Sequence, residues 1–209
     1  MLLPSLALAV FLALGAASAR AETVLLGLGD SLMAGYGLDD RESFTVQLEA
    51  ALRDKGHKVR LVNAGVSGDT SAGGRARLDW ALAEKPDAAI VELGANDGLR
   101  GLEPERLYEN LDAILTRMDQ EGIPVLLAGM LAPPNFGTDY AKAFEAVYIR
   151  LAEKHGSVFY PFFLDGVAAE KLLNQGDGIH PNREGVAIIV ERILPKVEEL
   201  LGRVKKTAS

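Results

Sequence analysis

The sequence contains no cysteine, which excludes a thiol nucleophile, thiolate-bound zinc and disulfides. Positive charge is also scarce: Lys and Arg together number 22, Asp and Glu 29, and the formal net charge is −7. A general nucleic-acid binder would show a basic face, so we expect no nucleic-acid partner. The sequence has no Walker motif and no carboxylate-histidine cluster. We therefore expect no metal and no cofactor.

Long apolar runs are nearly absent too. After the N-terminus, no segment reaches the roughly 18 continuous apolar residues that a membrane span needs. The apolar run at 2–17 is followed by an A-x-A signal-peptidase pattern at 19–21. No Lys or Arg precedes this run, which leaves an uncleaved anchor or a misassigned start codon as alternatives. We predict a signal peptide at 1–21, a single domain at 22–209, and a periplasmic or secreted protein.

The 209 residues suit one compact domain, and the 48% of hydrophobic residues supply its core. Short apolar runs alternate with segments whose apolar residues recur at helical spacing. The strands we expect lie at 23–26, 57–62, 88–93, 124–129 and 157–160, and the main helices at about 44–52, 75–85, 104–118, 140–151 and from 183 onward. Such alternation predicts an α/β fold with a parallel sheet covered on both faces.

The first apolar run leads directly into Gly-Leu-Gly-Asp-Ser, which ends at Ser31. We expect these glycines to let the backbone turn tightly and leave the next side chain unobstructed. A serine between a strand end and a helix can face a ligand and receive converging backbone N–H groups, so Ser31 is a candidate nucleophile. Ser67 and Ser71 lie in a glycine-rich loop, where hydroxyls commonly stabilise turns. Asp30 should brace the loop, because adjacent side chains on a tight turn diverge.

A serine nucleophile usually needs a histidine base, and the chain offers three histidines. His57 lies in a charged turn, and His155 lies in a last helical turn, where it complements the helix dipole. His180 follows Asp177 by three residues in a glycine-bounded loop, so the carboxylate can meet one ring nitrogen while the other faces outward. The residues alone leave two interpretations open, a base for Ser31 and a loop-capping histidine.

Four blocks of the sequence resemble, in order, the four blocks of the SGNH (GDSL) hydrolase family. They are Gly-Asp-Ser-Leu at 29–32, Gly68 within 63–70, Asn96 within 94–98, and Asp-Gly-Ile-His-Pro-Asn at 177–182. Three further segments, at 34–38, 98–101 and 161–168, are similar to the bacterial periplasmic thioesterase, lysophospholipase and arylesterase branch of that family.

The resemblance implies a three-layer α/β/α fold with five parallel strands in the flavodoxin-like order 2-1-3-4-5. Ligands bind where such a sheet reverses direction, which would make Ser31 and Asn96 neighbours. It also implies a catalytic triad of Ser31, Asp177 and His180. The implied oxyanion hole consists of the backbone N–H groups of Ser31 and Gly68 and the side-chain amide of Asn96. Taken alone, Asn96 also fits a loop asparagine in left-handed geometry, and Gly68 is one glycine among several.

The resemblance implies hydrolysis of small-molecule carboxylic esters, fatty acyl thioesters and lysophospholipids through an acyl-enzyme. We also expect a monomer that makes transient contact with lipid. Alternatives are an SGNH esterase acting on acetylated carbohydrate and a non-catalytic, flavodoxin-like binding protein. We predict that loop residues at the strand ends line the acyl groove, and two of them, Leu99 and Ile179, also suit core packing. The predicted lining residues are Leu99, Arg100, Gly101, Pro133, Phe136 and Ile179.

Overall fold

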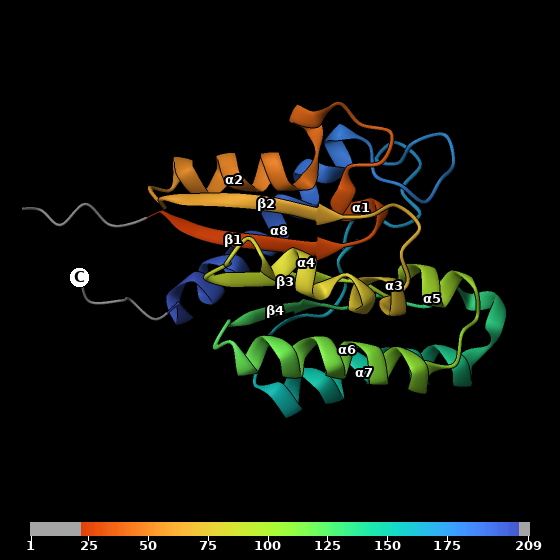
Figure 1. Cartoon of the computed structure of the whole chain (residues 1–209). Helices are drawn as coiled ribbons and strands as arrows, with labels where there is room; N and C mark the ends of the chain where they lie inside the picture. The colour runs from red at the N-terminus through yellow and green to blue at the C-terminus, as the bar shows by residue number, and fades with distance from the viewer. Residues whose placement is uncertain (1–21, 205–209) are drawn as a thin grey trace, which may run out of the picture.

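The computed structural model describes residues 22–204, and the predicted signal peptide lies outside this range (Figure 1). The strands are β1 (Thr23–Gly29), β2 (Val59–Gly65), β3 (Ala88–Glu92), β4 (Val125–Ala128) and β5 (Val158–Tyr160). The long helices are α2 (Phe44–Asp54), α6 (Pro104–Gln120), α7 (Thr138–His155) and α8 (Arg183–Arg203). The short helical segments are α1 (Ser31–Ala34), α3 (Ser71–Ala76), α4 (Leu78–Leu82), α5 (Ala95–Leu99) and the 3-10 turns η1 (Asp40–Glu42) and η2 (Pro134–Phe136).

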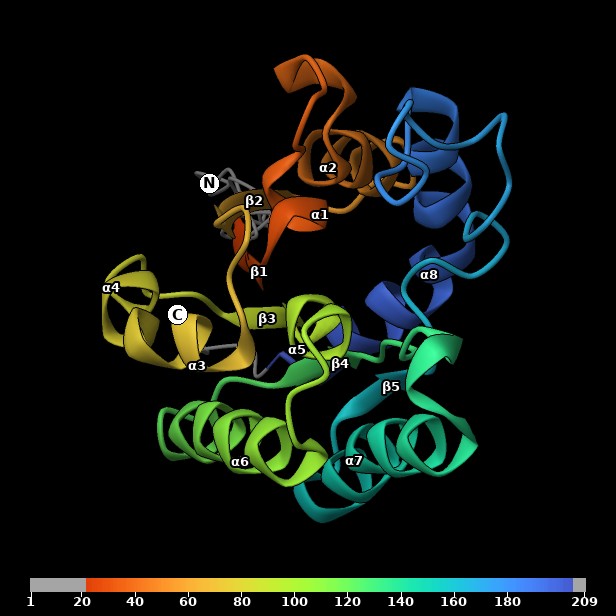
Figure 2. The ribbon, with the colours of Figure 1, turned by 90° about the vertical axis from the view of Figure 1, so that its right-hand side faces the viewer.

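The five strands form one parallel sheet in the order β2-β1-β3-β4-β5, which confirms the predicted topology. Helices α2 and α8 cover one face, and α3, α4, α6 and α7 cover the other (Figures 1 and 2). Gly29 of β1 pairs with Gly65 of β2 and with Glu92 of β3. Three strands therefore end at one level. The loops that follow them meet at the carboxyl ends of the strands, which face the viewer in Figure 2.

The core lies between the sheet and the two helical layers. On α6, the predicted apolar face is fully buried and consists of Leu107, Leu111, Ile114, Leu115 and Met118. This helix packs on the sheet because its apolar residues recur every three or four positions and form one face, while its charged residues lie on the opposite face. Within residues 22–204, no helix is long and apolar enough to cross a membrane.

The end of β1 differs from the prediction, because the strand continues to Gly29 and its two glycines lie inside it rather than in a turn. A Cβ on Gly29 would lie 2.5 Å from Cβ of Met33 and 2.6 Å from Oε2 of Glu92. The missing side chain therefore lets α1 fold back against the strand end, a tertiary requirement that local sequence does not reveal. The helix expected up to residue 85 is likewise two short helices, α3 and α4.

Candidate active site

The serine turn, residues 29–37, holds Ser31 at the edge of the sheet. Ser31 is the first residue of α1, and Asp30 caps that helix by accepting a hydrogen bond from the Leu32 N–H at 3.0 Å. Gly35 ends the helix in the left-handed conformation, at φ 80°, which glycine adopts without steric cost. One short turn of helix therefore fixes the Ser31 hydroxyl at the end of β1. Asp30 stabilises this loop through its capping hydrogen bond, as predicted.

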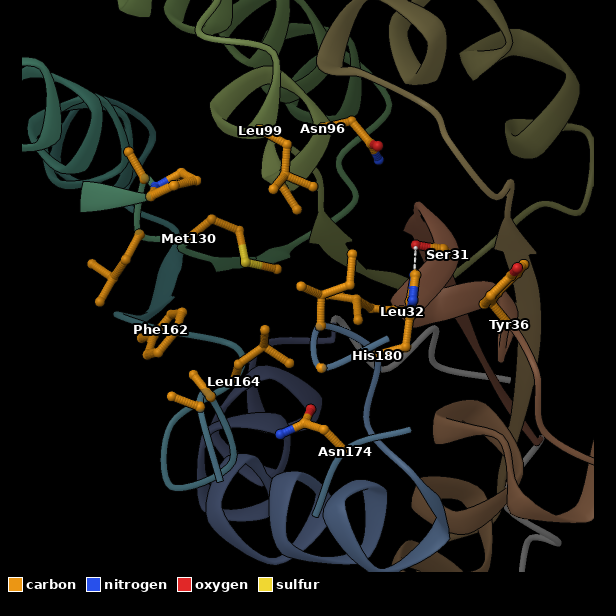
Figure 3. A pocket seen from close by; sticks show the side chains of 18 of the residues that line it. Ser31, Leu32, Tyr36, Asn96, Leu99, Met130, Phe162, Leu164, Asn174 and His180 are labelled. Carbon is orange, nitrogen blue, oxygen red and sulfur yellow. Dashed lines mark hydrogen bonds between the residues drawn. The ribbon is translucent and has the colours of Figure 1, made fainter. Parts of the chain in front are cut away.

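The histidine loop, residues 174–182, brings His180 to Ser31 (Figure 3). Nε2 of His180 lies 2.9 Å from Oγ of Ser31, and Nδ1 lies 2.6 Å from Oδ2 of Asp177. Oδ1 of Asp177 accepts the backbone N–H groups of Ile179 and His180, at 3.0 and 3.1 Å. A carboxylate on Nδ1 favours the tautomer with the proton there, which leaves Nε2 free to accept the serine proton.

Asp177 is held in its charged form. The hydrogen bond with His180 and the two backbone N–H groups lower the pKa of Asp177 to about 2. Its side chain is 39% exposed, so solvent also supports the negative charge. The sequence placed this carboxylate within reach of His180 by spacing alone, and the structure joins both to Ser31 across 149 positions of chain.

The other candidates for nucleophile and base have different partners. Nε2 of His57 lies 3.1 Å from Oε1 of Glu198, and the two ring nitrogens of His155 lie 2.7 and 2.5 Å from carboxylates on α6. Oγ of Ser71 donates to the buried carboxylate of Asp97 at 2.6 Å. Ser67 lines the same cavity as Ser31, and among residues 22–204 no hydrogen bond joins its hydroxyl to a histidine. His57, His155 and Ser71 therefore connect helices and loops rather than forming a second nucleophile–base pair.

The three residues that carry the predicted oxyanion donors, Ser31, Gly68 and Asn96, all line one cavity. Among residues 22–204, no hydrogen bond uses the N–H of Ser31 or of Gly68, and both residues line the cavity. Asn96 lies on α5, where a loop was expected. Its Nδ2 donates to Oδ2 of Asp30 at 3.1 Å and to the carbonyl of Asp69 at 2.9 Å. Both amide hydrogens are therefore engaged, and they hold the Asn96 side chain beside Ser31.

Glu92 is a buried carboxyl group that lies under the serine turn. It ends β3, is fully buried, and accepts a hydrogen bond from the Asp30 N–H through Oε2 at 3.4 Å, while Oε1 has no hydrogen-bond partner among the residues that the structure describes. Burial, aided by the Asp30 charge, raises the pKa of Glu92 well above its usual range. Burial likewise raises the pKa of Asp30 to about 6. Sequence reasoning missed Glu92, although a lone carboxylate in an apolar strand was a signal for it.

A cavity of about 480 Å³ opens beside Ser31 and is mostly apolar (Figure 3). Three of the predicted lining residues, Leu99, Pro133 and Ile179, contribute to its wall. Sequence reasoning missed the other apolar contributors, which come from the serine turn, from α5 and from the segments after β4 and β5: Leu32, Tyr36, Ala95, Met130, Leu131, Ala132, Phe162, Leu164, Ala168 and Ala169. Within residues 22–204, no group of three or more potential metal ligands is found.

The other three predicted lining residues, Arg100, Gly101 and Phe136, lie outside the cavity wall. Nη2 of Arg100 donates to the carbonyl of Gly68 at 2.9 Å, so its guanidinium supports the loop. The Phe136 ring packs at 5.3 Å from the Tyr140 ring, and a Cβ on Gly101 would lie 2.5 Å from Phe136. These residues therefore contact neighbouring loops and helices instead of the cavity, which sequence position alone could not reveal.

The chain is similar to three bacterial proteins. It is 44% identical over 184 residues to the esterase TesA of Pseudomonas aeruginosa, covering 88% of this chain and 91% of that protein. It is 38% identical over 187 residues to an arylesterase of Vibrio mimicus, with coverage of 89% and 93%. It is 39% identical over 194 residues to thioesterase 1/protease 1/lysophospholipase L1 of Escherichia coli, with coverage of 92% and 91%.

A solved structure agrees with these relatives. The esterase EstA of Pseudoalteromonas sp., solved with the inhibitor monoethylphosphonate, matches with a TM-score of 0.82 and 31% identity. The match covers 87% of this chain and all of that one. A model of the GDSL-like lipase/acylhydrolase family matches residues 28–188, which contain the serine turn, Asn96 and the histidine loop. The chain therefore belongs to the GDSL-like lipase/acylhydrolase family.

Proposed function

We propose that this protein hydrolyses carboxylic esters and fatty acyl thioesters through an acyl-enzyme formed on Ser31. The observation that carries the proposal is the continuous hydrogen-bonded path from Ser31 through His180 to Asp177, with distances of 2.9 and 2.6 Å, beside an apolar cavity. The names of the relatives, an esterase, an arylesterase and a thioesterase/lysophospholipase, support the same reaction class.

The chemistry follows from the direction of these hydrogen bonds. Nε2 of His180 takes the hydroxyl proton as Oγ of Ser31 attacks the acyl carbonyl, and Asp177 stabilises the imidazolium without taking the proton. His180 then protonates the leaving alcohol or thiol, and the acyl group stays on Ser31. A water molecule, deprotonated by His180, attacks the acyl-enzyme. The bond between the acyl carbon and Oγ of Ser31 then breaks, the acid leaves, and His180 returns the proton to Oγ.

The negative oxygen formed in each step needs hydrogen-bond donors. The free N–H groups of Ser31 and Gly68 supply two, and the Asn96 amide supplies a third by sharing one hydrogen with its present acceptors in a three-centre bond. Removing one such donor costs about 2.7–4 kcal/mol in comparable enzymes. Asp30 and the Asp69 carbonyl keep the amide in place between turnovers.

The cavity favours an acyl chain over a sugar. Its wall beyond Ser31 is built largely from aliphatic and aromatic side chains, including Leu164, Met130 and Phe162, whereas a carbohydrate needs many polar partners. On p-nitrophenyl esters we expect the rate to rise from acetyl to medium-length chains. In the cell, we propose a monomeric periplasmic or secreted enzyme that meets acyl substrates at or near lipid, and the N-terminal sequence of the exported protein tests the location.

Replacement of Ser31 tests the proposed reaction. We expect Ser31→Ala to lower kcat for p-nitrophenyl butyrate by at least about 10⁴-fold and to abolish fluorophosphonate labelling, while the thermal unfolding curve is retained. Ser67→Ala is the matched control. Ser67 lines the same cavity as Ser31 but is not the proposed nucleophile, so this variant should remain active. Substantial turnover by Ser31→Ala would refute the proposal, and an unlabelled wild-type protein would favour a non-catalytic binder.

A further inference from the structure

The contact between Ser31 and His180 joins two segments that are far apart in sequence and separately built. Inside the histidine loop, the Gln175 N–H donates to the His180 carbonyl at 2.8 Å, and the Gly178 N–H donates to the Gln175 carbonyl at 3.0 Å. Together with the Asp177 side chain, these bonds fix the shape of the loop. They do not fix its distance from the serine turn, on which proton transfer depends.

Gln175 supplies that link. Its Nε2 donates one hydrogen bond to the Tyr36 carbonyl in the serine turn, at 2.8 Å, and another to the Pro181 carbonyl in the histidine loop, at 2.9 Å. Among the described residues, the bond to Tyr36 is the only hydrogen bond between the two segments apart from the one between Ser31 and His180. The amide group of Gln175 therefore connects the serine turn to the histidine loop.

Two further contacts reinforce the link. The Tyr36 ring lies against the imidazole of His180, with ring centroids 4.6 Å apart, so Tyr36 contacts the base through its ring and Gln175 through its carbonyl. Figure 3 shows Tyr36 beside Ser31 and His180. Gly37, at φ 72°, leaves room for the amide, since a Cβ there would lie 2.2 Å from Oε1 of Gln175.

From this geometry we infer that Gln175 is a positioning residue, which sets the distance between Ser31 and His180 by tying the histidine loop to the serine turn. The inference rests on the proposed ester hydrolysis. Gln175 does not line the cavity beside Ser31, so its effect should fall on the chemical step and not on substrate binding. A misplacement of about 1 Å between reacting groups costs roughly 100-fold in rate.

The test is Gln175→Met, which keeps the length of the side chain and removes both donors. We expect kcat for p-nitrophenyl butyrate to fall by about 10- to 100-fold per active site, counted by fluorophosphonate titration, with KM within about threefold of wild type. The matched control is Gln47→Met. Nε2 of Gln47 also donates to two carbonyls, those of Glu42 at 2.7 Å and Arg183 at 3.3 Å, and among the described residues it makes no hydrogen bond to either segment.

A second variant serves if Gln175→Met fails to fold. Gly37→Ala should displace the Gln175 amide without removing its donors, and kcat should fall as it does in Gln175→Met. Gly56→Ala is its control, because Gly56 also has positive φ, at 87°, with nothing within 4 Å of a Cβ. Titrated kcat values equal to those of the controls would overturn the positioning role. A wild-type protein that neither labels nor turns over would overturn the proposed hydrolysis as well.

Discussion

The two halves of the site use carboxylates in opposite ways. Under the serine turn, Asp30 and Glu92 are fully buried, and burial raises the pKa of both. In the histidine loop, Asp177 is partly exposed, and its hydrogen bonds lower its pKa to about 2. In the buried half, therefore, the surroundings oppose the charge of each carboxyl group, whereas the surface loop favours the charge of Asp177.

This difference separates stability from chemistry. A carboxyl buried among strand ends stabilises the backbone it caps but loses hydration when it ionises. A carboxylate on a solvated loop costs little to keep charged and can stabilise the imidazolium that forms during the reaction. We therefore expect substitutions in the histidine loop to act on kcat and substitutions beneath the serine turn to act on the free energy of unfolding.

The largest expected effect is that of Asp177→Asn. The amide keeps the shape of the carboxylate but removes the charge and favours the wrong tautomer of His180, so kcat should fall by about 10⁴-fold. The midpoint of thermal unfolding should fall only modestly, because solvent screens the hydrogen bonds through which the charged Asp177 contributes to stability. The measurement is kcat with p-nitrophenyl butyrate beside a thermal unfolding curve.

A control from the buried half sharpens this result. Glu92→Gln replaces a carboxyl whose burial already favours the neutral form. Its kcat should therefore stay within about tenfold of wild type, because no charge next to His180 is lost. The division between the two halves would be wrong if Asp177→Asn kept most of its activity. It would also be wrong if the kcat of Glu92→Gln fell as far as that of Asp177→Asn.

The next effect concerns the packing of the serine turn. A Cβ on Gly65 of β2 would lie 2.3 Å from the backbone nitrogen of Ala34 in α1, and backbone cannot move aside as a side chain can. We expect Gly65→Ala to lower the free energy of unfolding by about 3 kcal/mol, measured by urea unfolding. Gly202→Ala, in α8, meets no atom within 4 Å and should leave stability unchanged or slightly higher.

Activity distinguishes this variant from those in the histidine loop. The loss of activity in Gly65→Ala should follow the fraction of folded protein, so kcat per fluorophosphonate-titrated serine should stay within about tenfold of wild type. A large loss of titrated kcat without a loss of stability would show that α1 is tuned for catalysis and not merely packed.

Much of this site could be predicted from local sequence. The spacing of Asp177 and His180 sets their contact, because three residues in a tight loop bring a carboxylate to a ring nitrogen. The strand order followed from the resemblance to a family, and the apolar stripe of α6 from its period. These features depend on neighbours in sequence or on a shared pattern, and the structure confirms the contact, the strand order and the stripe.

What could not be predicted depends on contacts between distant segments. The glycines of β1 leave room for α1 and for the side chain of Glu92, which lies 62 positions from Asp30. The cavity wall takes Met130 and Phe162 from segments that meet only when β4 and β5 pair. Arg100 was predicted in the lining, but its guanidinium turns to the Gly68 carbonyl. Sequence position indicates which loops meet at the sheet edge, but not which side chains of those loops face the cavity.

The smallest effect is a pH dependence that should differ in sign between the two halves. The pKa of Asp30 rises from 3.8 to about 6 on folding, so between these values the folded state holds a proton that the unfolded state has lost. Stability should therefore fall as pH rises from 4 to 6 and stay lower above. Asp177, whose pKa is lowered to about 2, contributes stability that is present above pH 4 and is lost as pH falls toward 2.

Asp30→Asn should therefore reduce the fall in unfolding free energy between pH 4 and pH 7 by about 2 kcal/mol, leaving the part that Glu92 contributes. The quantity to compare is the difference between the two pH values, measured by urea unfolding, because the amide also changes the hydrogen bonds to Leu32 and Asn96 at every pH. Asp177→Asn is the control and should leave that difference unchanged, since its own window lies below pH 4. An unaltered pH difference in Asp30→Asn would place the titrating group elsewhere and would remove the electrostatic distinction between the two halves.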